Sequence, residues 1–225
     1  EYSKTAAAPT TQFHGEELNF YGLLKKMQSD NRLIRKEAMK AWAALYESIS
    51  EKLDSIYTEL MKLRLQMAGN LGFSSYEEMV FLKMGRYTYT PEDLAVFRRQ
   101  VCEHIVPICE KLFENQRRRL GIDTLHYYDE SIVFPDGNAM PIGTTQELLK
   151  KAGKMYREIS KETGDFFDFM LAYDLFDLET RNGKQQGGYC TTFPDYKAPF
   201  IFSNFNGTDA DIDVLTHEAG HSFEA

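Results

Sequence analysis

The stretch NRLIRKEAMKAWAALYESISEKLDSIYTELMKLRLQM, residues 31–67, has an uninterrupted helical pattern. Apolar side chains recur in it at three- and four-residue spacing, as at Leu45, Ile49, Leu53 and Ile56, and this spacing places them on one face of a helix. The stretch therefore predicts a single helix well above the average length of about 11 residues. A helix this long favours a helical bundle or an extended lobe wall over a sandwich or a barrel.

The segments on both sides of this stretch extend the helical pattern to residues 16–176. Further helices are predicted over residues 16–29, 74–85, 90–121, about 144–163, and from there to about Phe176. Three of them start with Ser or Thr followed three residues later by an acidic residue, the signature of a capping box: Ser75 and Glu78, Thr90 and Asp93, Thr144 and Glu147. Pro107 predicts a kink in the 90–121 helix, because proline removes a helical hydrogen bond. Residues 122–143 are expected to form short extended pieces and turns.

The last fifty residues have a different character. A glycine-rich segment, RNGKQQGGY, precedes two runs typical of short strands, YCTTF and PFIFSNF, at about 189–204. A helix is expected over about 208–223, with Thr208 as its N-cap and with Asp209 and Asp211 complementing the helix dipole in its first turn. We expect residues 1–225 to form one region, mainly α-helical, with a few short strands before the last helix.

Composition excludes several classes of function. The chain has 225 residues, 43% of them hydrophobic, and a formal charge of −8, which argues against a nucleic-acid partner because such binding needs excess positive charge. Its three cysteines suggest no disulfide framework, which favours a reducing compartment. No stretch approaches the roughly 20 apolar residues of a membrane span. We therefore expect a soluble, cytoplasmic protein without a membrane partner, and the first residue, Glu rather than Met, suggests a piece of a longer protein.

The sequence HEAGH at residues 217–221 carries the clearest chemical signal. On a helix, His217 and His221 lie four residues apart on one face, so both imidazoles can bind one Zn²⁺. Glu218 lies one step round the helix, where it can act as the general base that takes a proton from the metal-activated water. This arrangement predicts metal-assisted hydrolysis of a carbonyl compound, with the alternative that two helix-surface histidines lie near one another without function.

A catalytic zinc usually has three protein ligands, and the third is not obvious in this chain. The backbone of Glu224 lies about 10 Å along the helix axis from that of His217, too far for its carboxylate to reach. The other histidines, His14, His104 and His126, have no ligand-like spacing, and we expect no functional role for them. Cys190 has no identifiable histidine partner and is expected to be a small buried hydrophobic residue.

Residues 181–225, RNGKQQGGYCTTFPDYKAPFIFSNFNGTDADIDVLTHEAGHSFEA, resemble the oligoendopeptidase F family, relatives of thimet oligopeptidase. The resemblance lies in the combination of a glycine pair before Tyr, the PFIFSNF strand, the acidic helix start and HEAGH. Upstream, NRLIRKEAMKAWAALYESI is similar to the preceding region of the same family, so the resemblance covers essentially the whole chain, more weakly towards its start.

The resemblance implies a helical zincin-type peptidase with a deep channel that admits unstructured peptides and excludes folded proteins. It implies that His217 and His221 hold one zinc ion and that Glu218 is the general base. In the family, the third ligand is a glutamate on a later helix, and the residues that stabilise the oxyanion follow it. Both would lie beyond Ala225, so the resemblance identifies the chain as an internal part of a zinc endopeptidase catalytic domain.

Two further expectations accompany this identification. The strands before HEAGH are expected to flank the cleft, where a peptide can pair with an exposed strand edge, and Gly187 and Gly188 would allow close approach of a backbone or form a simple turn. The competing interpretation is a helical piece that is inactive as it stands and acts at most as a weak metal- or peptide-binding module. A glutamate on a downstream helix would distinguish the two. The sequence leaves side-chain specificity and oligomeric state open.

Overall fold

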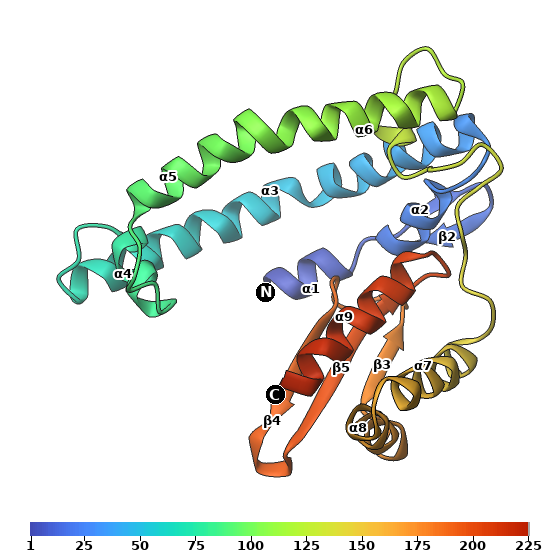
Figure 1. Cartoon of the computed structure of the whole chain (residues 1–225). Coiled ribbons are helices and arrows are strands. Elements are labelled where there is room, and N and C mark those ends of the chain that lie inside the picture. The colour runs from blue at the N-terminus through green and yellow to red at the C-terminus, as the bar shows by residue number, and fades with distance from the viewer. Residues whose placement is uncertain (225) are drawn as a thin grey trace.

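The computed structural model describes residues 1–224 and is mainly α-helical, as predicted (Figure 1). The helices are α1 (Tyr2–Ala7), α2 (Phe20–Lys26), α3 (Arg32–Asn70), α4 (Tyr76–Lys83), α5 (Pro91–Gln100), α6 (Val106–Arg119), α7 (Thr145–Ile159), α8 (Lys161–Ala172) and α9 (Ala210–Glu224). The strands are β1 (Thr11–Phe13), β2 (Glu16–Leu18), β3 (Phe176–Glu179), β4 (Tyr189–Phe193) and β5 (Ala198–Phe205). Short 3₁₀ turns occur at Tyr127–Asp129 and Pro194–Tyr196.

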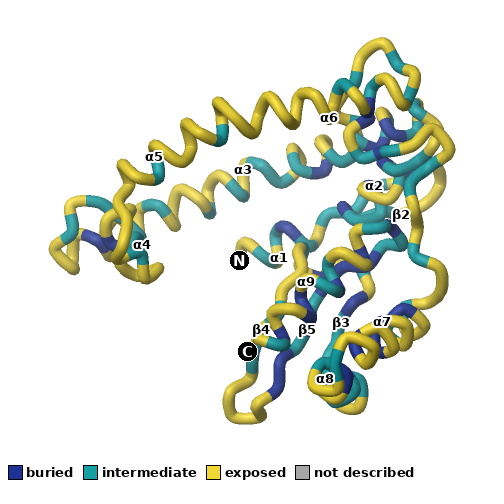
Figure 2. Tube along the Cα trace, in the orientation of Figure 1, coloured by how far each residue is buried: buried dark blue, intermediate teal, exposed yellow. Residues whose placement is uncertain are grey.

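Helix α3 confirms the predicted long helix and continues three residues beyond its predicted end. The Asn31 side chain caps its start by accepting a hydrogen bond from the backbone N–H of Leu33. In Figure 1, α3 and the pair α5–α6 extend in the same direction, away from the sheet. Figure 2 shows that both are largely exposed along this extension, and α5 contains no buried residue.

The interruption predicted at Pro107 takes the form of a π-helical turn over Val101–Ile105, between α5 and α6. The backbone N–H of Val106 donates to the carbonyl of Val101, five residues earlier. Pro107 cannot donate to the carbonyl four residues before it, and the wider turn accommodates this missing bond.

The helix starts follow the predicted capping signals. Complete capping boxes form at Thr90 and Thr144, which begin α5 and α7. At α4 the Ser75 hydroxyl accepts from the N–H of Glu78, but the Glu78 carboxylate turns back to Ser74 instead of Ser75. The hydrogen bond from the Glu78 carboxylate back to the chain is therefore made to the residue before the N-cap, and the capping box at α4 is incomplete.

Three predicted boundaries were wrong. Residues 16–18 form β2, paired with β1 in a hairpin around His14 and Gly15, and α2 begins only after Asn19. The predicted helix over 144–163 ends at Ile159, because Ser160 is extended and its hydroxyl caps α8. Residues 176–179 form β3, whereas the sequence pattern predicted that a helix continued to Phe176.

A mixed three-stranded sheet with the order β3-β5-β4 supports the C-terminal helix. Strand β5 pairs parallel with β3 and antiparallel with β4, so β4 is an edge strand. Helix α9 packs on β5 and β4 and buries Leu215 and Ala219 in a core shared with α7, α8 and the sheet. This packing fixes which face of α9 remains free.

A buried ionic cluster joins the start of α3 to the loop that follows α6. The Asp129 carboxylate accepts hydrogen bonds from Arg32 and Arg35, each 2.8 Å from Nη2. Gln116 of α6 donates to three backbone carbonyls of the same loop. Burial by itself raises the pKa of Asp129, but the hydrogen bonds from Arg32 and Arg35 outweigh that effect, and the pKa is about 2.

Within residues 1–224, no helix combines the length and the apolar character needed to cross a membrane.

Candidate metal centre

Helix α9 starts two residues later than predicted. The Thr208 hydroxyl donates to the Asn206 side chain instead of capping the helix. Asp211, in the first turn, accepts from the backbone N–H groups of Asn206 and Gly207 at 3.0 and 2.7 Å. Burial raises the pKa of Asp211 above its usual value. These bonds fix the β5–α9 turn and thereby the position of the helix over the sheet.

The imidazoles of His217 and His221 converge on one side of α9. Their Nε2 atoms lie 3.2 Å apart, and the two rings are nearly perpendicular. Two nitrogens at about 2.05 Å from a tetrahedral zinc are separated by about 3.3 Å. The two histidines therefore fit adjacent positions around one zinc ion.

Glu218 points into a groove between α9 and β4. The groove has a volume of about 570 Å³ and is lined by Gly188, Tyr189, Cys190, Thr191, Thr192, Glu218 and His221. Glu218 is only 8% exposed, and within residues 1–224 its carboxylate accepts no hydrogen bond. A buried carboxylate that opens onto a groove beside two metal-type ligands can act as a base towards a bound water.

No third metal ligand accompanies the two imidazoles in residues 1–224, where no group of three or more His, Cys, Asp or Glu side chains is placed to hold a metal ion. The Glu224 carboxylate lies 3.9 Å from Nδ1 of His221, and thus beside the ring nitrogen that does not face His217. That Glu224 is not the third ligand stays a prediction.

The remaining histidines lie apart from this centre. The Nε2 atom of His14 lies 2.9 Å from a carboxylate oxygen of Glu37 in an exposed contact, and His126 stacks on Tyr128. His104 lies in the exposed π-helical turn.

Cys190 is only half-buried, contrary to the expected buried position. Its Sγ lies 3.2 Å from the Ser222 hydroxyl, which itself donates to the backbone carbonyl of Glu218. This contact between β4 and α9 was not predicted, because it depends on the antiparallel pairing of β4 with β5. It ties β4, which carries the groove-lining Cys190, to α9.

The glycine-rich segment is held by side chains from distant parts of the chain. The Asn204 side chain donates to the carbonyls of Gln185 and Gly187, and the Gly187 N–H donates to the Tyr21 hydroxyl. A Cβ atom at Gly188 would lie 3.0 Å from a methyl carbon of Val214 on α9. Gly188 therefore allows the segment to approach α9 closely, which places the start of β4 beside the groove.

The sequence profile of Peptidase family M3 matches residues 26–225, and the chain belongs to this family. It is 22% identical over 210 residues to Group B oligopeptidase PepB of Streptococcus agalactiae serotype III (strain NEM316), covering 93% of this chain and 34% of that protein. It is 25% identical over 199 residues to an oligoendopeptidase F homolog of Lactococcus lactis subsp. lactis (strain IL1403), covering 88% and 32%.

Among solved structures, PZ peptidase A with inhibitor 2 superposes with a TM-score of 0.96 at 48% identity, over 99% of this chain and 40% of that one. The fold and the family are thus those that the resemblance implied. The chain spans about a third of the length of the curated relatives it matches.

Proposed function

We propose that this chain is part of the catalytic domain of a zinc-dependent endopeptidase that hydrolyses short, unstructured peptides. The observation that carries the proposal is the convergence of His217 and His221, 3.2 Å apart, beside the groove-facing Glu218 in a member of Peptidase family M3. The relatives named oligopeptidase and oligoendopeptidase support a peptide substrate.

His217 and His221 would hold one zinc ion, with a third ligand from a part of the protein outside this chain. When bound, zinc supplies a Lewis acid that activates water and polarises a carbonyl. Glu218 would accept the proton of the attacking water and pass it to the departing amine, because its carboxylate opens onto the same groove as the imidazole of His221. Its low exposure shields that carboxylate from bulk solvent.

The free edge of β4 would orient the peptide. Strand order leaves one side of β4 unpaired in the described sheet, and Gly188 to Thr192 line the groove together with Glu218. An extended peptide can add to such an edge through backbone hydrogen bonds, which are independent of its side chains. This arrangement would place a peptide carbonyl beside the centre and would exclude a segment already paired in a folded protein.

Metal analysis of the full-length protein tests the ligand assignment. His217→Ala and His221→Ala should each lower zinc affinity by at least about 100-fold, since even loss of a supporting contact costs about 10- to 100-fold. Each should also abolish cleavage of a quenched fluorescent peptide. His14→Ala is the matched control, because it removes an exposed imidazole far from the centre, and it should change neither. Full zinc content with normal activity in either ligand variant would contradict the assignment.

A further inference from the structure

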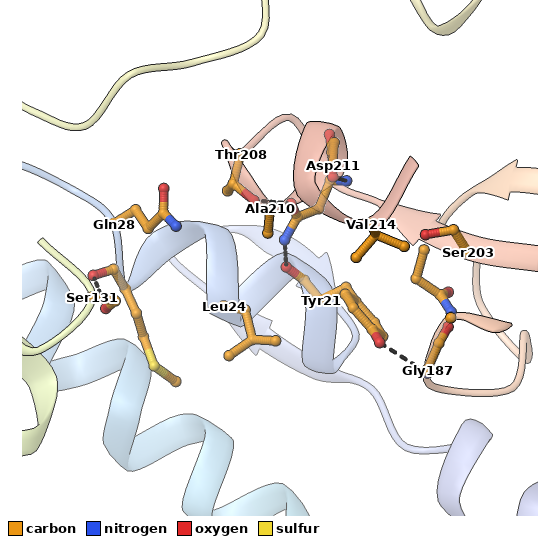
Figure 3. A pocket seen from close by; sticks show the side chains of 14 residues that line it. Tyr21, Leu24, Gln28, Ser131, Gly187, Ser203, Thr208, Ala210, Asp211 and Val214 are labelled. Carbon is orange, nitrogen blue, oxygen red and sulfur yellow. Dashed lines mark hydrogen bonds between the residues drawn. The ribbon is translucent and has the colours of Figure 1, made fainter. Parts of the chain in front are cut away.

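A second cavity lies beside the start of α9 and the glycine-rich segment (Figure 3). It has a volume of about 260 Å³, is partly open to solvent, and is lined by residues of α2, the β5–α9 turn and the first two turns of α9. Its apolar walls come from Leu24, Met27, Ala210 and Val214. An engineered apolar cavity of about 150 Å³ binds benzene, so this one has room for a branched aliphatic or aromatic side chain.

The cavity and the groove are neighbours, because Gly188 lines both. On α9, Ala210, Val214 and Glu218 follow one another at four-residue spacing and so share a face. Val214 lies about 6 Å from Glu218 along the helix axis. Successive same-face side chains of an extended peptide are spaced by about 6.8 Å. A peptide that crosses Glu218 along β4 thus reaches the cavity within two or three residues.

Most polar groups in the cavity wall already have partners within the described chain. The Tyr21 hydroxyl accepts from Gly187, Asn206 donates to the Tyr21 carbonyl, and Gln28 donates to Asp209. Figure 3 shows the two hydrogen bonds of Tyr21, one at its hydroxyl and one at its carbonyl. The polar atoms that these groups still offer a ligand, the Tyr21 hydroxyl proton and the Gln28 side-chain oxygen, are uncharged.

Ser203 is a buried polar residue in this wall whose hydroxyl is free. Its side chain is more than nine-tenths buried, and within residues 1–224 its hydroxyl forms no hydrogen bond. It lies next to Gly188 and Val214. A free hydroxyl at this point suits one hydrogen bond to a passing peptide backbone, beside the apolar wall formed by Leu24, Met27, Ala210 and Val214.

We propose that this cavity is a specificity pocket that binds one apolar side chain, such as that of Leu or Phe, at a fixed position near the cleaved bond. The inference rests on the proposed peptidase function and adds the chemistry that selects the peptide. Ala210 and Val214 determine the size of the pocket, and Gly188 keeps its entrance open. The proposed substrates are then short peptides that carry an apolar residue at one fixed position near the cleaved bond.

The test compares substitutions that fill or enlarge the pocket in the full-length zinc-loaded enzyme. Ala210→Phe should fill it and Val214→Ala should enlarge it, whereas Ile212→Phe adds the same ring to the exposed side of α9 as a control. The readout is kcat/KM for quenched fluorescent peptides that carry Ala, Leu, Phe or Asp at each position in turn. Wild type should prefer Leu or Phe over Asp at one position by about 10- to 100-fold.

Ala210→Phe should reduce cleavage of the Leu and Phe peptides at that position to the level of Ala and leave all other positions unchanged. Val214→Ala should shift the preference towards Phe, and Ile212→Phe should match wild type. Equal loss at every position, or an unchanged preference in Ala210→Phe, would overturn the pocket assignment. If wild type cleaved no peptide, the proposed function would fail. The pocket assignment would then be tested by calorimetry, and the affinities for the same peptides should show the same preference for Leu or Phe at one position and the same effects of the three substitutions.

Discussion

At the scale of single residues, Glu218 combines two properties that oppose one another in most carboxylates. It is buried, yet its carboxylate opens onto a groove instead of accepting hydrogen bonds from neighbouring groups. A carboxylate in this position is available to take a proton, because no local donor competes for its oxygens. The two converging imidazoles would bind the proposed metal themselves. Glu218 would then lie beside the metal without serving as a ligand.

Replacing Glu218 with Gln should therefore separate metal binding from catalysis. The Glu218→Gln variant keeps the size of the side chain and should retain zinc, while peptide hydrolysis should fall by about 10²- to 10⁴-fold, the typical cost of losing a general base. Zinc content and kcat measured on the same full-length preparation decide this. Glu224→Gln, which neutralises the exposed carboxylate next to His221, serves as the control and should remain active. Near-normal turnover by zinc-loaded Glu218→Gln protein would refute the role.

At the scale of elements, Asp129 links α3 to the loop after α6. Removing its charge leaves Arg35 buried without its carboxylate partner, and breaking such a buried pair typically costs about 3 kcal/mol or more. Asp129→Asn should lower the free energy of unfolding by about this amount near neutral pH, as measured by urea denaturation. Asp123→Asn removes an exposed charge from the same loop and should have little effect.

The cost of Asp129→Asn should also depend on pH. The pKa of Asp129 is about 2 in the folded chain, below its usual value of 3.8. The stabilisation is therefore complete above about pH 4 and is lost as the pH falls towards 2, where the wild-type carboxylate becomes protonated. The difference between wild type and variant should narrow over this interval. A difference that stays constant down to about pH 2 would show that the charge of Asp129 is not its source.

The elements that sequence patterns predicted well are those specified by local signals. The spacing of apolar residues from Leu45 to Ile56 and the boxes at Thr90 and Thr144 depend only on neighbours within a few residues. Strand β3 was missed because its four residues pair with β5, more than twenty residues later. Strand β2 was missed because two of its three residues are glutamates, which are uncommon in strands.

The residues of the candidate site also fall into those that a local pattern predicts and those that only the fold brings together. His217, Glu218 and His221 share one helix, so the sequence alone was sufficient to predict that they lie together. The specificity pocket brings Leu24 of α2 next to Ala210 and Val214, and no local pattern relates residues so far apart. Thr208 was predicted as the N-cap because its residue type fits, but its hydroxyl donates a hydrogen bond to the Asn206 side chain instead.

At the scale of the whole molecule, the chain covers about a third of its curated relatives and leaves apolar residues exposed on its long helices. Leu63 of α3, Phe97 of α5 and Leu112 of α6 are each more than half exposed. Such faces are typical of surfaces that another part of a protein covers. The same reasoning applies to the candidate metal centre, where residues 1–224 provide two converging imidazoles.

The 225-residue chain by itself should therefore bind zinc weakly and cleave no peptide. Two imidazoles from one helix leave the remaining coordination positions to water, and His221 lies in the last turn, where helices fray. Calorimetric titration of zinc, with the His217→Ala, His221→Ala double variant as blank, and a peptide assay measure both properties. A longer chain that includes the later helix on which the resemblance places a glutamate ligand should bind zinc tightly and cleave peptides. Tight binding and cleavage by the short chain would require a third ligand within residues 1–225.

The free edge of β4 has one more consequence, which concerns self-association. An unpaired strand edge accepts the backbone of any extended chain, including a second copy of itself, and so favours aggregation. In this chain the edge is only five residues long. Gly188, with little strand propensity, precedes it, and Pro194, which cannot donate a hydrogen bond, follows it. The short edge can hold a few residues of a loose peptide but offers too little length for another sheet to continue across it.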